Sequence, residues 1–508
     1  MTRLTTSLLA LMLLVTLSAQ AQIDRTKKPA AGPAPKAAFP EYHETTLSNG
    51  LKVLIVTNNA QPLVTFRLQI KSGGAFEQKS GLSGFVTDLL TKGTAKRSSL
   101  QFATEADNIG VSIGAGSDDD AISVFGSGLK KHTEKILDLM TDAMYNPVFP
   151  DTEIDKLRKQ TLSGLTSEKK DPDAISGRLQ ITVGFNDHPY SHFATEASVK
   201  SITRDDIVAF HKTYFLPNNS SLAIVGDVSP NDILPLIRKY FDSWKKGTVP
   251  VANFPKPKPI TGRSVHLVDL GSTQTQTSLA VMTTGIARNH PDYTALSMAN
   301  SILGGGFSGR LFQNLREKHS FTYGAYSNPD ARRDAGVWMA SSDVRRAATD
   351  SAAREMINEM QRMQNEPVPD TELESHKQYA VGRYLLSLEN PSTTAQRVQD
   401  IDLFGLPKDY FKTYAARVMA ITAGDIARVA RQYFSTDNLA VAAVGDVTAI
   451  RSSLEQFGPV FVYDTDMKSV TNAGPMELDI DVETLLRKHV EALGGDAAVR
   501  KITNRTVE

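Results

Sequence analysis

The sequence predicts an α+β protein in which one domain of about two hundred residues occurs twice in tandem. Three observations lead to this fold class. A segment near the end of the first half recurs in the second half, strand-like and helix-like segments alternate within each half, and a proline-rich segment separates the halves. Each domain is expected to hold a mostly antiparallel or mixed sheet with helices packed on one face.

The internal repeat is an ungapped match of residues 201–228 with residues 420–447, an offset of 219. Each copy predicts a helix that is capped by Thr203 or Thr422 and followed by a buried strand ending in Val-Gly-Asp-Val. Earlier segments match more loosely: the segment from Gly114 corresponds to the segment from Gly324 at an offset of 210. Changing offsets indicate insertions in loops between equivalent elements.

The remaining elements follow from hydrophobic patterns. In the first half, strands are predicted at 51–56, 64–70, 121–127 and 222–225, and helices at 129–145 and 151–169; residues 277–283 form the matching strand of the second half. The first two strands have hairpin spacing, which suggests an antiparallel or mixed sheet with helices on one face. Asp118, Asp119 and Asp120 could attract a hard cation, but the run is more typical of a solvated loop.

The domain organisation begins with an apolar run at 8–17 followed by Ala19-Gln20-Ala21, which predicts a cleavable signal peptide. The protein is therefore expected to be exported, to the periplasm or the extracellular space. The predicted parts are signal peptide 1–21, flexible Pro/Ala-rich leader 22–40, first domain 41–248, linker 249–262, second domain 263–463, and a tail 464–508. The tail, with a helix at 481–493, is interpreted as a linker and the start of a further small domain, or as a docking tail.

Composition excludes several classes of function. The chain has no cysteine, which excludes disulfides and a lipid anchor on cysteine, and it carries 56 basic and 56 acidic residues. No dense basic stripe with interleaved aromatic residues occurs, so nucleic acid is not an expected partner. No segment after the signal peptide is apolar enough to predict a transmembrane helix.

Residues 80–94, SGLSGFVTDLLTKGT, predict an amphipathic helix with Gly84, Thr87 and Asp88 on its polar side. This segment resembles the zinc-site helix of the insulinase or pitrilysin type (M16) metallopeptidases, in the branch of bacterial processing-peptidase-like proteins. The family carries a His-x-x-Glu-His motif framed as it is here by Gly-Leu and Lys-Gly-Thr. The resemblance implies that Gly84 and Asp88 stand at the two metal histidines and Thr87 at the catalytic glutamate.

The resemblance also places a third metal ligand, a glutamate, near Ser163 and Gly164, where this chain has no carboxylate. A catalytic zinc needs three protein ligands and a water, and a threonine hydroxyl is not a usable general base. His188 and His192 have helical metal spacing, but Pro189 interrupts a helix there. We therefore expect no metal ligands and no zinc in this chain, and no autonomous metallopeptidase activity.

A glycine-rich block in the second half, Leu303 to Gly324, contains Gly304, Gly305 and Gly306 and predicts a helix followed by a strand. It resembles the second domain of the same peptidases, where an arginine and a tyrosine seven residues apart contact the substrate. The resemblance implies that Arg316 and Tyr323 bind peptide, the tyrosine donating to the oxyanion that forms at a partner's zinc. The alternative is a surface arginine paired with Glu317 or Asp330 beside a core tyrosine.

These features suggest a non-catalytic, peptide-binding subunit of an exported M16-type zinc peptidase. In relatives of this type, two chains close like a clamshell around an extended peptide, and a zinc-bearing partner supplies the metal. A scaffold or peptide-binding protein without a peptidase partner is the alternative. An enzyme of another mechanism lacks support, because the chain has neither cysteine nor a Gly-x-Ser-x-Gly motif.

Overall fold

The computed structural model describes residues 39–470, 487–488 and 490–492. The predicted signal peptide, most of the leader and most of the predicted helix at 481–493 lie outside the described residues. Phe39 marks the start of one compact unit, which contains both predicted domains. Within the described part of the chain, no helix is both long and apolar enough to cross a membrane.

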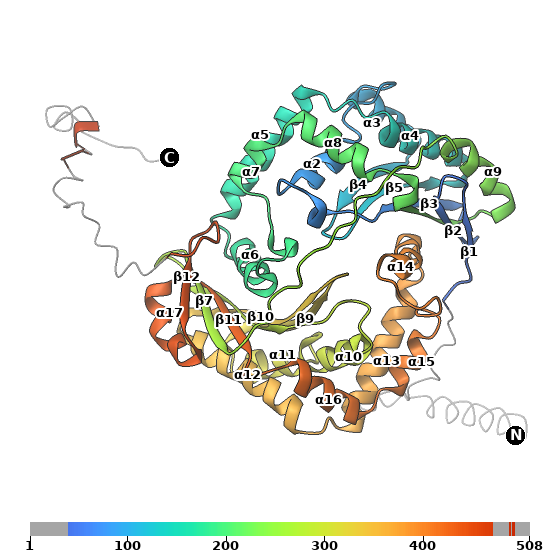
Figure 1. The fold of residues 1–508 in the computed structure, drawn as a ribbon. Helices are drawn as coiled ribbons and strands as arrows, with labels where there is room; N and C mark the ends of the chain where they lie inside the picture. The colour runs from blue at the N-terminus through green and yellow to red at the C-terminus, as the bar shows by residue number, and fades with distance from the viewer. Residues whose placement is uncertain (1–38, 471–486, 489, 493–508) are drawn as a thin grey trace, which may run out of the picture. The chain divides into compact units, whose positions relative to one another are not determined.

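Two six-stranded mixed sheets form the framework, and this confirms the predicted α+β fold class (Figure 1). The first sheet has the order β1-β2-β6-β3-β5-β4, and the second has the order β12-β7-β11-β8-β10-β9. The strands of the first sheet are β1 (His43–Thr46), β2 (Lys52–Thr57), β3 (Leu63–Ile70), β4 (Ser112–Ser117), β5 (Ile122–Leu129) and β6 (Ser220–Gly226). Those of the second are β7 (Arg263–Asp269), β8 (Gln276–Thr284), β9 (Thr322–Ala331), β10 (Gly336–Arg345), β11 (Leu439–Gly445) and β12 (Val460–Tyr463).

The order of the strands in each sheet differs from their order in the sequence. β2 and β3 have hairpin spacing in the sequence, but β6 lies between them, parallel to β2 and antiparallel to β3. The late strand of the repeat thus completes the centre of each sheet, because β11 lies between β7 and β8 in the same way. Every residue of β6 and of β11 is buried, which agrees with this central position.

The structure extends the 219-residue repeat well beyond the segment found by sequence matching. Four elements of the first half have counterparts that begin 219 residues later. The pairs are α5 (Asp151–Glu168) with α13 (Asp370–Ser387), α6 (Pro172–Phe185) with α14 (Pro391–Leu403), α8 (Arg204–Tyr214) with α16 (Ala423–Tyr433), and β6 with β11. Both copies of the α8-type helix begin with the predicted threonine cap, Thr203 or Thr422.

Each sheet packs most helices of its own half on one face. The first core includes α2 (Leu82–Leu89), α3 (Ser99–Asp107), α4 (Thr133–Tyr145), α5, α7 (Glu196–Ser201), α8 and α9 (Pro230–Phe241). The second core includes α10 (Tyr293–Gly304), α11 (Arg310–Phe312), α12 (Thr349–Asn365), α13, α15 (Tyr414–Ala420), α16 and α17 (Val447–Leu454). Alternation along β2 sends Val53 and Ile55 into the first core and turns Leu54 and Val56 to the opposite face.

The opposite face of each sheet is covered by a helix from the other half (Figure 1). α14 packs its Ala395 and Val398 against the first sheet, where Leu54 and Val56 lie. Reciprocally, α6 packs against β8 and β11 of the second sheet. Each half therefore depends on the other for burial of one apolar sheet face, which favours a single cooperative unit.

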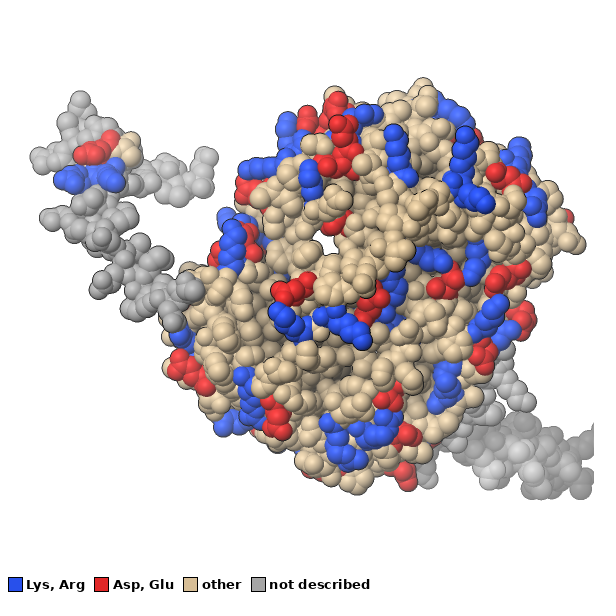
Figure 2. All heavy atoms as spheres, in the orientation of Figure 1, with Lys and Arg blue, Asp and Glu red and all other residues tan. Residues whose placement is uncertain are grey.

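Charged contacts also join the halves. Asp119 forms an ion pair with Arg332, and the buried Asp120 accepts hydrogen bonds from the backbone N–H of Arg333 (2.9 Å) and from the hydroxyl of Tyr190. The prediction of a solvated loop holds for the exposed Asp118 but is wrong for Asp119 and Asp120, which contact Arg332 and Arg333 of the β9–β10 turn. On the face drawn in Figure 2, Lys and Arg lie interspersed with Asp and Glu.

Candidate functional site

The helix predicted at 80–94 is α2, and it presents the degenerate motif as the spacing suggests. Leu82, Phe85, Val86 and Leu89 are buried in the first core. Gly84 has open space around it: a Cβ added there would meet nothing within 4 Å. Thr87 is buried, and its hydroxyl donates a hydrogen bond to the carbonyl oxygen of Gly84 at 3.0 Å.

Asp88 lies at the wall of a cavity of about 410 Å³ that α5 and β4 also line. Partial burial raises the pKa of Asp88, and the ammonium of Lys92 opposes this rise. The α5 side of the cavity contributes Glu153, Lys156 and Gln160. A Cβ has room at position 84, but the glycine that is present has no side-chain donor atom.

The donor set does not fit a catalytic zinc. Zinc in peptidases takes three His or carboxylate ligands, whereas α2 offers one carboxylate, Asp88, and a threonine hydroxyl that is already committed to the backbone. Across residues 39–470 and the few described residues beyond them, no group of three His, Cys, Asp or Glu side chains could hold a metal ion. The side chains on the polar face of α2 therefore do not match the ligand set of a catalytic zinc.

The histidine pair His188 and His192 is not helical. Pro189 begins a short 3-10 turn, Pro189–Ser191, and Nδ1 of the buried His188 accepts a hydrogen bond from the backbone N–H of Tyr190 at 3.1 Å. Burial lowers the pKa of His188. His188 therefore has the structural role that the proline predicts.

The three glycines of the second-half block serve different purposes. A Cβ at Gly304 would come within 2.6 Å of the backbone nitrogen of Ser327, so Gly304 permits α10 to lie directly against β9. A Cβ at Gly305 would meet the Cα of Ser301 at 2.6 Å, whereas a Cβ at Gly306 would meet nothing within 4 Å. Gly305 and Gly306 are at least partly exposed, and only these two could approach a ligand.

Arg316 is carried by a π-helical turn at Gln313–Lys318 that continues α11. Such turns are rare in proteins, and those that occur are often found at functional sites. The guanidinium of Arg316 lies 4.8 Å from the ring centroid of Phe312, and its Nε is 3.5 Å from Oε1 of Glu317. The side chain is exposed, so this weak surface pair leaves Arg316 accessible.

Tyr323 stands in a β-bulge at the start of β9. Tyr323 and Gly324 together oppose the single residue Asp343 of β10, where the register shifts. Thr322 fixes the bulge, because its hydroxyl accepts from the N–H of Gly324 at 3.0 Å and donates to the carbonyl of Asp343 at 2.6 Å. Ser320, at φ 53°, provides the left-handed residue that turns the chain from the π-helical turn into β9.

The bulge directs Tyr323 outward, and its side chain is 86% exposed. A bulge re-aims side chains in this way at the edges of sheets. The alternative of a core tyrosine beside Arg316 is therefore wrong, although the predicted Glu317 contact is present. β9 is the edge strand of its sheet, and Tyr323 lies where that edge begins.

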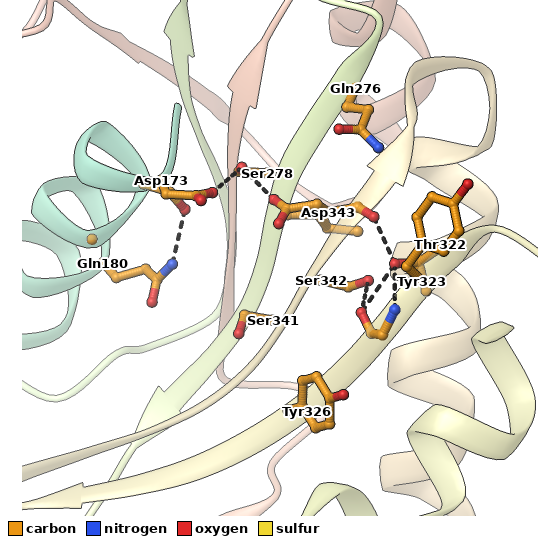
Figure 3. Close-up of a pocket in the computed structure, with 14 residues that line it drawn as sticks. Asp173, Gln180, Gln276, Ser278, Thr322, Tyr323, Tyr326, Ser341, Ser342 and Asp343 are labelled. Carbon is orange, nitrogen blue, oxygen red and sulfur yellow. Dashed lines mark hydrogen bonds between the residues drawn. The ribbon is translucent and has the colours of Figure 1, made fainter. Parts of the chain in front are cut away.

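Tyr323 lines a cavity of about 650 Å³ between α6 and the strands β8, β9 and β10. Figure 3 shows Tyr323 and Tyr326 on one side of this cavity and Asp173 and Gln180 of α6 on the other. Ser278 donates to Asp343, and its oxygen lies 3.3 Å from Oδ1 of Asp173, which links α6 to the sheet. Arg316 does not line this cavity.

An exposed aromatic cluster adjoins the same site, and little in the sequence pattern predicts it. Phe307 is 68% exposed and Tyr326 is 42% exposed. Phe307 packs edge-on against Phe312 at 5.0 Å, and Tyr326 lies 6.4 Å from Phe307. Tyr326 also lines the Tyr323 cavity, so these rings place exposed apolar side chains near Tyr323, a feature typical of protein or peptide contacts.

Comparison with known proteins places this arrangement in a family. The sequence model of insulinase (peptidase family M16) matches residues 52–190, and that of the peptidase M16 inactive domain matches residues 201–379. Together they account for more than half of the chain. The chain belongs to peptidase family M16.

Solved M16 structures share the fold. The peptidase M16 inactive domain from Pseudomonas fluorescens superposes with a TM-score of 0.74 at 23% identity, over 80% of this chain and 98% of that one. A protease from Helicobacter pylori gives a TM-score of 0.75 at 21% identity, over 80% and 100%. An uncharacterized zinc protease of Streptomyces coelicolor is 24% identical over 423 residues, 82% of this chain and 89% of the relative.

Within this M16 fold, the two halves differ in what they can do chemically. The α2 face offers no set of three metal donors within the described residues, and the hydroxyl of Thr87 is bonded to the backbone. The second half presents hydrogen-bond donors at an exposed edge, from Tyr323 and Arg316, beside exposed aromatic rings. Donors of this kind bind peptide carbonyls and stabilise developing negative charge.

Proposed function

We propose that this chain is a non-catalytic, peptide-binding subunit of an exported M16-type zinc peptidase and completes the substrate site of a zinc-bearing partner chain. The observation that carries the proposal is Tyr323, which a bulge holds 86% exposed at the wall of a large cavity, in a chain whose α2 offers only one carboxylate, Asp88, as a metal donor. A purely structural chain gains nothing from an exposed aromatic side chain at that position.

Three further features support peptide binding. β9 is an edge strand, so its free backbone groups can pair with an extended peptide. Phe307 and Tyr326 add apolar contact area beside it. Arg316 supplies a fork of N–H donors that suits carbonyl oxygens.

Peptide binding is tested by fluorescence anisotropy with the purified chain and fluorescein-labelled, unfolded α-casein. Y323A and R316Q are each expected to weaken binding about tenfold, because each removes a direct contact. L100A is the matched control, since Leu100 is a 77% exposed side chain on α3, away from the site. Equal affinity of Y323A, R316Q and wild type would contradict peptide binding at this edge.

The partner is tested by native co-purification with mass spectrometry. Recovery of a chain of similar size with a His-x-x-Glu-His motif supports the subunit role. The reconstituted pair is then expected to cleave peptide, with activity lost on chelation, and Y323F is expected to lower kcat by about 10²-fold if the hydroxyl contacts the oxyanion. Chelator-sensitive hydrolysis by this chain alone would contradict the proposal.

A further inference from the structure

A second cavity, of about 470 Å³, lies between α10, α13 and α14 and shares no lining residue with the Tyr323 cavity. Its volume is in the range of small-ligand sites, about 300–1,000 Å³. Its wall includes five polar or charged side chains that could contact a ligand: Arg288, Ser297, Arg383, Arg397 and Asp400. Gly305 of the glycine block also lines it.

The charge of the lining is unbalanced. Three guanidinium groups, from Arg288, Arg383 and Arg397, face one carboxylate, Asp400. Among the residues that the structure describes, none of these three arginines forms an ion pair within 4.0 Å, and neither does Asp400. Arginines at a cavity wall without carboxylate partners are a typical arrangement for anion recognition.

Aromatic rings hold two of these arginines in place without using all their donors. The guanidinium of Arg288 lies 4.0 Å from the ring centroid of Tyr293, and its Nη1 donates to the hydroxyl of Tyr410 at 3.0 Å. The guanidinium of Arg397 lies 4.5 Å from the ring centroid of Tyr384. Stacking fixes the plane of a guanidinium and leaves N–H groups at its edge available.

Two buried polar atoms at the wall have no hydrogen-bond partner within the described part of the chain. They are Nη1 of Arg397 and Oγ of Ser297. An unsatisfied buried donor costs about 1–3 kcal/mol, and more when it is charged. A ligand that brings acceptor oxygens into the cavity removes that cost.

The tandem repeat gives an independent reason to consider this location. α13 is the counterpart of α5 at the 219-residue offset, so Arg383 occupies the position of Gly164. The resemblance places the family's third metal ligand near Ser163 or Gly164, and a Cβ added at Gly164 meets nothing within 4 Å. The second half thus carries a cation near the position equivalent to that metal ligand.

We propose that this cavity is an oxyanion-binding site in which Arg288, Arg383 and Arg397 hold a carboxylate or phosphate group. The site stands on its own geometry and does not depend on peptide binding at Tyr323. Because Gly305 forms part of the wall, the oxyanion can belong to a peptide that contacts the glycine block or to a free small anion. The two sources share the same recognition chemistry.

The affinity for an anion should depend on the charge of Asp400. Burial raises the pKa of Asp400 to about 6; Arg67 on β3, Arg288 after β8 and Arg397 on α14 oppose the rise, and Asp118 after β4 adds to it. Protonation below that pH removes the negative charge from the wall, while the arginines stay charged. Anion affinity is therefore expected to increase as the pH falls from 7.5 to 5.5.

Isothermal titration calorimetry with sodium sulfate tests the site on the full chain. Sulfate keeps its charge over this pH range, and sodium chloride at the same ionic strength corrects for screening. We expect saturable binding that is tighter at pH 5.5, and a loss of about tenfold in R383Q or R397Q. R451Q, on the exposed face of α17, removes the same charge and should bind as wild type does.

Separate controls test whether the variants fold and whether the bound oxyanion comes from a peptide or from a free anion. Arg383 is exposed, so R383Q keeps the fold, and R397K should recover part of the affinity by restoring the charge. A short peptide with a free C-terminal carboxylate that competes with sulfate, while its amide does not, identifies the peptide as the source. Competition by inorganic phosphate alone identifies a free anion. Absence of saturable sulfate binding, or equal binding in R383Q, R397Q and wild type, would overturn the proposal.

Discussion

Gln399 of α14 makes two hydrogen bonds to Arg67 of β3. Its Oε1 accepts from Nη1 of Arg67 at 2.5 Å, and its Nε2 donates to the backbone carbonyl of Arg67 at 2.8 Å. The same Nε2 also donates to the carbonyl of Ser221 in β6 at 2.8 Å. One fully buried amide of the second half thus satisfies polar groups at the centre of the first sheet.

Q399L is therefore expected to lower the free energy of unfolding by about 2–4 kcal/mol, because it leaves buried acceptors and part of the Arg67 guanidinium without partners. Urea denaturation followed by circular dichroism measures the change. Gln396, exposed on the same helix, is the control: Q396L should change stability by less than about 0.5 kcal/mol. Equal stability of Q399L and wild type would show that this contact does not couple the halves.

Two glycine substitutions should have opposite signs. G84A is expected to stabilise the protein by about 0.5–1 kcal/mol, because alanine favours helix and the added Cβ meets nothing within 4 Å. G304A is expected to destabilise it by about 1–3 kcal/mol, since its Cβ would overlap the backbone of Ser327. Thermal unfolding of the two variants in parallel tests both. A rise in Tm for G304A would disprove the packing role of Gly304.

Zinc binding should not return with the α2 motif alone. The variant G84H/T87E/D88H gains two histidine ligands but lacks the third, so we expect no stoichiometric zinc after dialysis, as measured by inductively coupled plasma mass spectrometry. Adding G164E, where a Cβ has open space, should raise zinc occupancy. Stoichiometric zinc in the triple variant would show that the third ligand lies elsewhere.

The partial burial of Asp119, beside Arg332, predicts a pH dependence of stability. Burial raises the pKa of Asp119 to about 6; Arg332 opposes the rise, and Asp120, Asp118 and Asp330 add to it. A carboxyl whose pKa is higher in the folded state binds more protons there between about pH 4 and 6, so its contribution to stability falls as the pH rises through that window.

D119N removes this titration. Between pH 4 and 6.5, the fall in the free energy of unfolding should be smaller in D119N than in wild type by about 1–3 kcal/mol. D155N, an exposed carboxylate on α5, serves as the control and should follow the wild-type profile. Parallel profiles for D119N and wild type would contradict the assignment.

The sequence predicted elements whose signal is local. The repeat, the capped helices at Thr203 and Thr422, and the amphipathic helix that carries Gly84, Thr87 and Asp88 all follow from short-range patterns, and the structure contains them. Strand order was harder to predict. β6 enters between β2 and β3 from far along the chain, and hairpin spacing carries no information about a strand that arrives later.

The sequence named candidate site residues but not their geometry. Family resemblance pointed to Arg316 and Tyr323, yet the bulge opposite Asp343 and the π-helical turn depend on hydrogen bonds between strands and turns that no periodicity reveals. The burial of Asp120 was not predictable for a similar reason. A run of three aspartates is typical of solvent, and only the tertiary fold brings Tyr190 and Arg333 over it.

The reciprocal positions of α6 and α14 suggest why two copies of this domain are stable when joined in one chain. A lone copy of this domain would expose an apolar sheet face, and two copies could cover each other only by exchanging one helix, as swapped dimers do. Fusing the copies makes that exchange intramolecular and independent of protein concentration. Joined in this way, the two copies no longer need identical surfaces, and one can lose its ligands while the other keeps an exposed tyrosine.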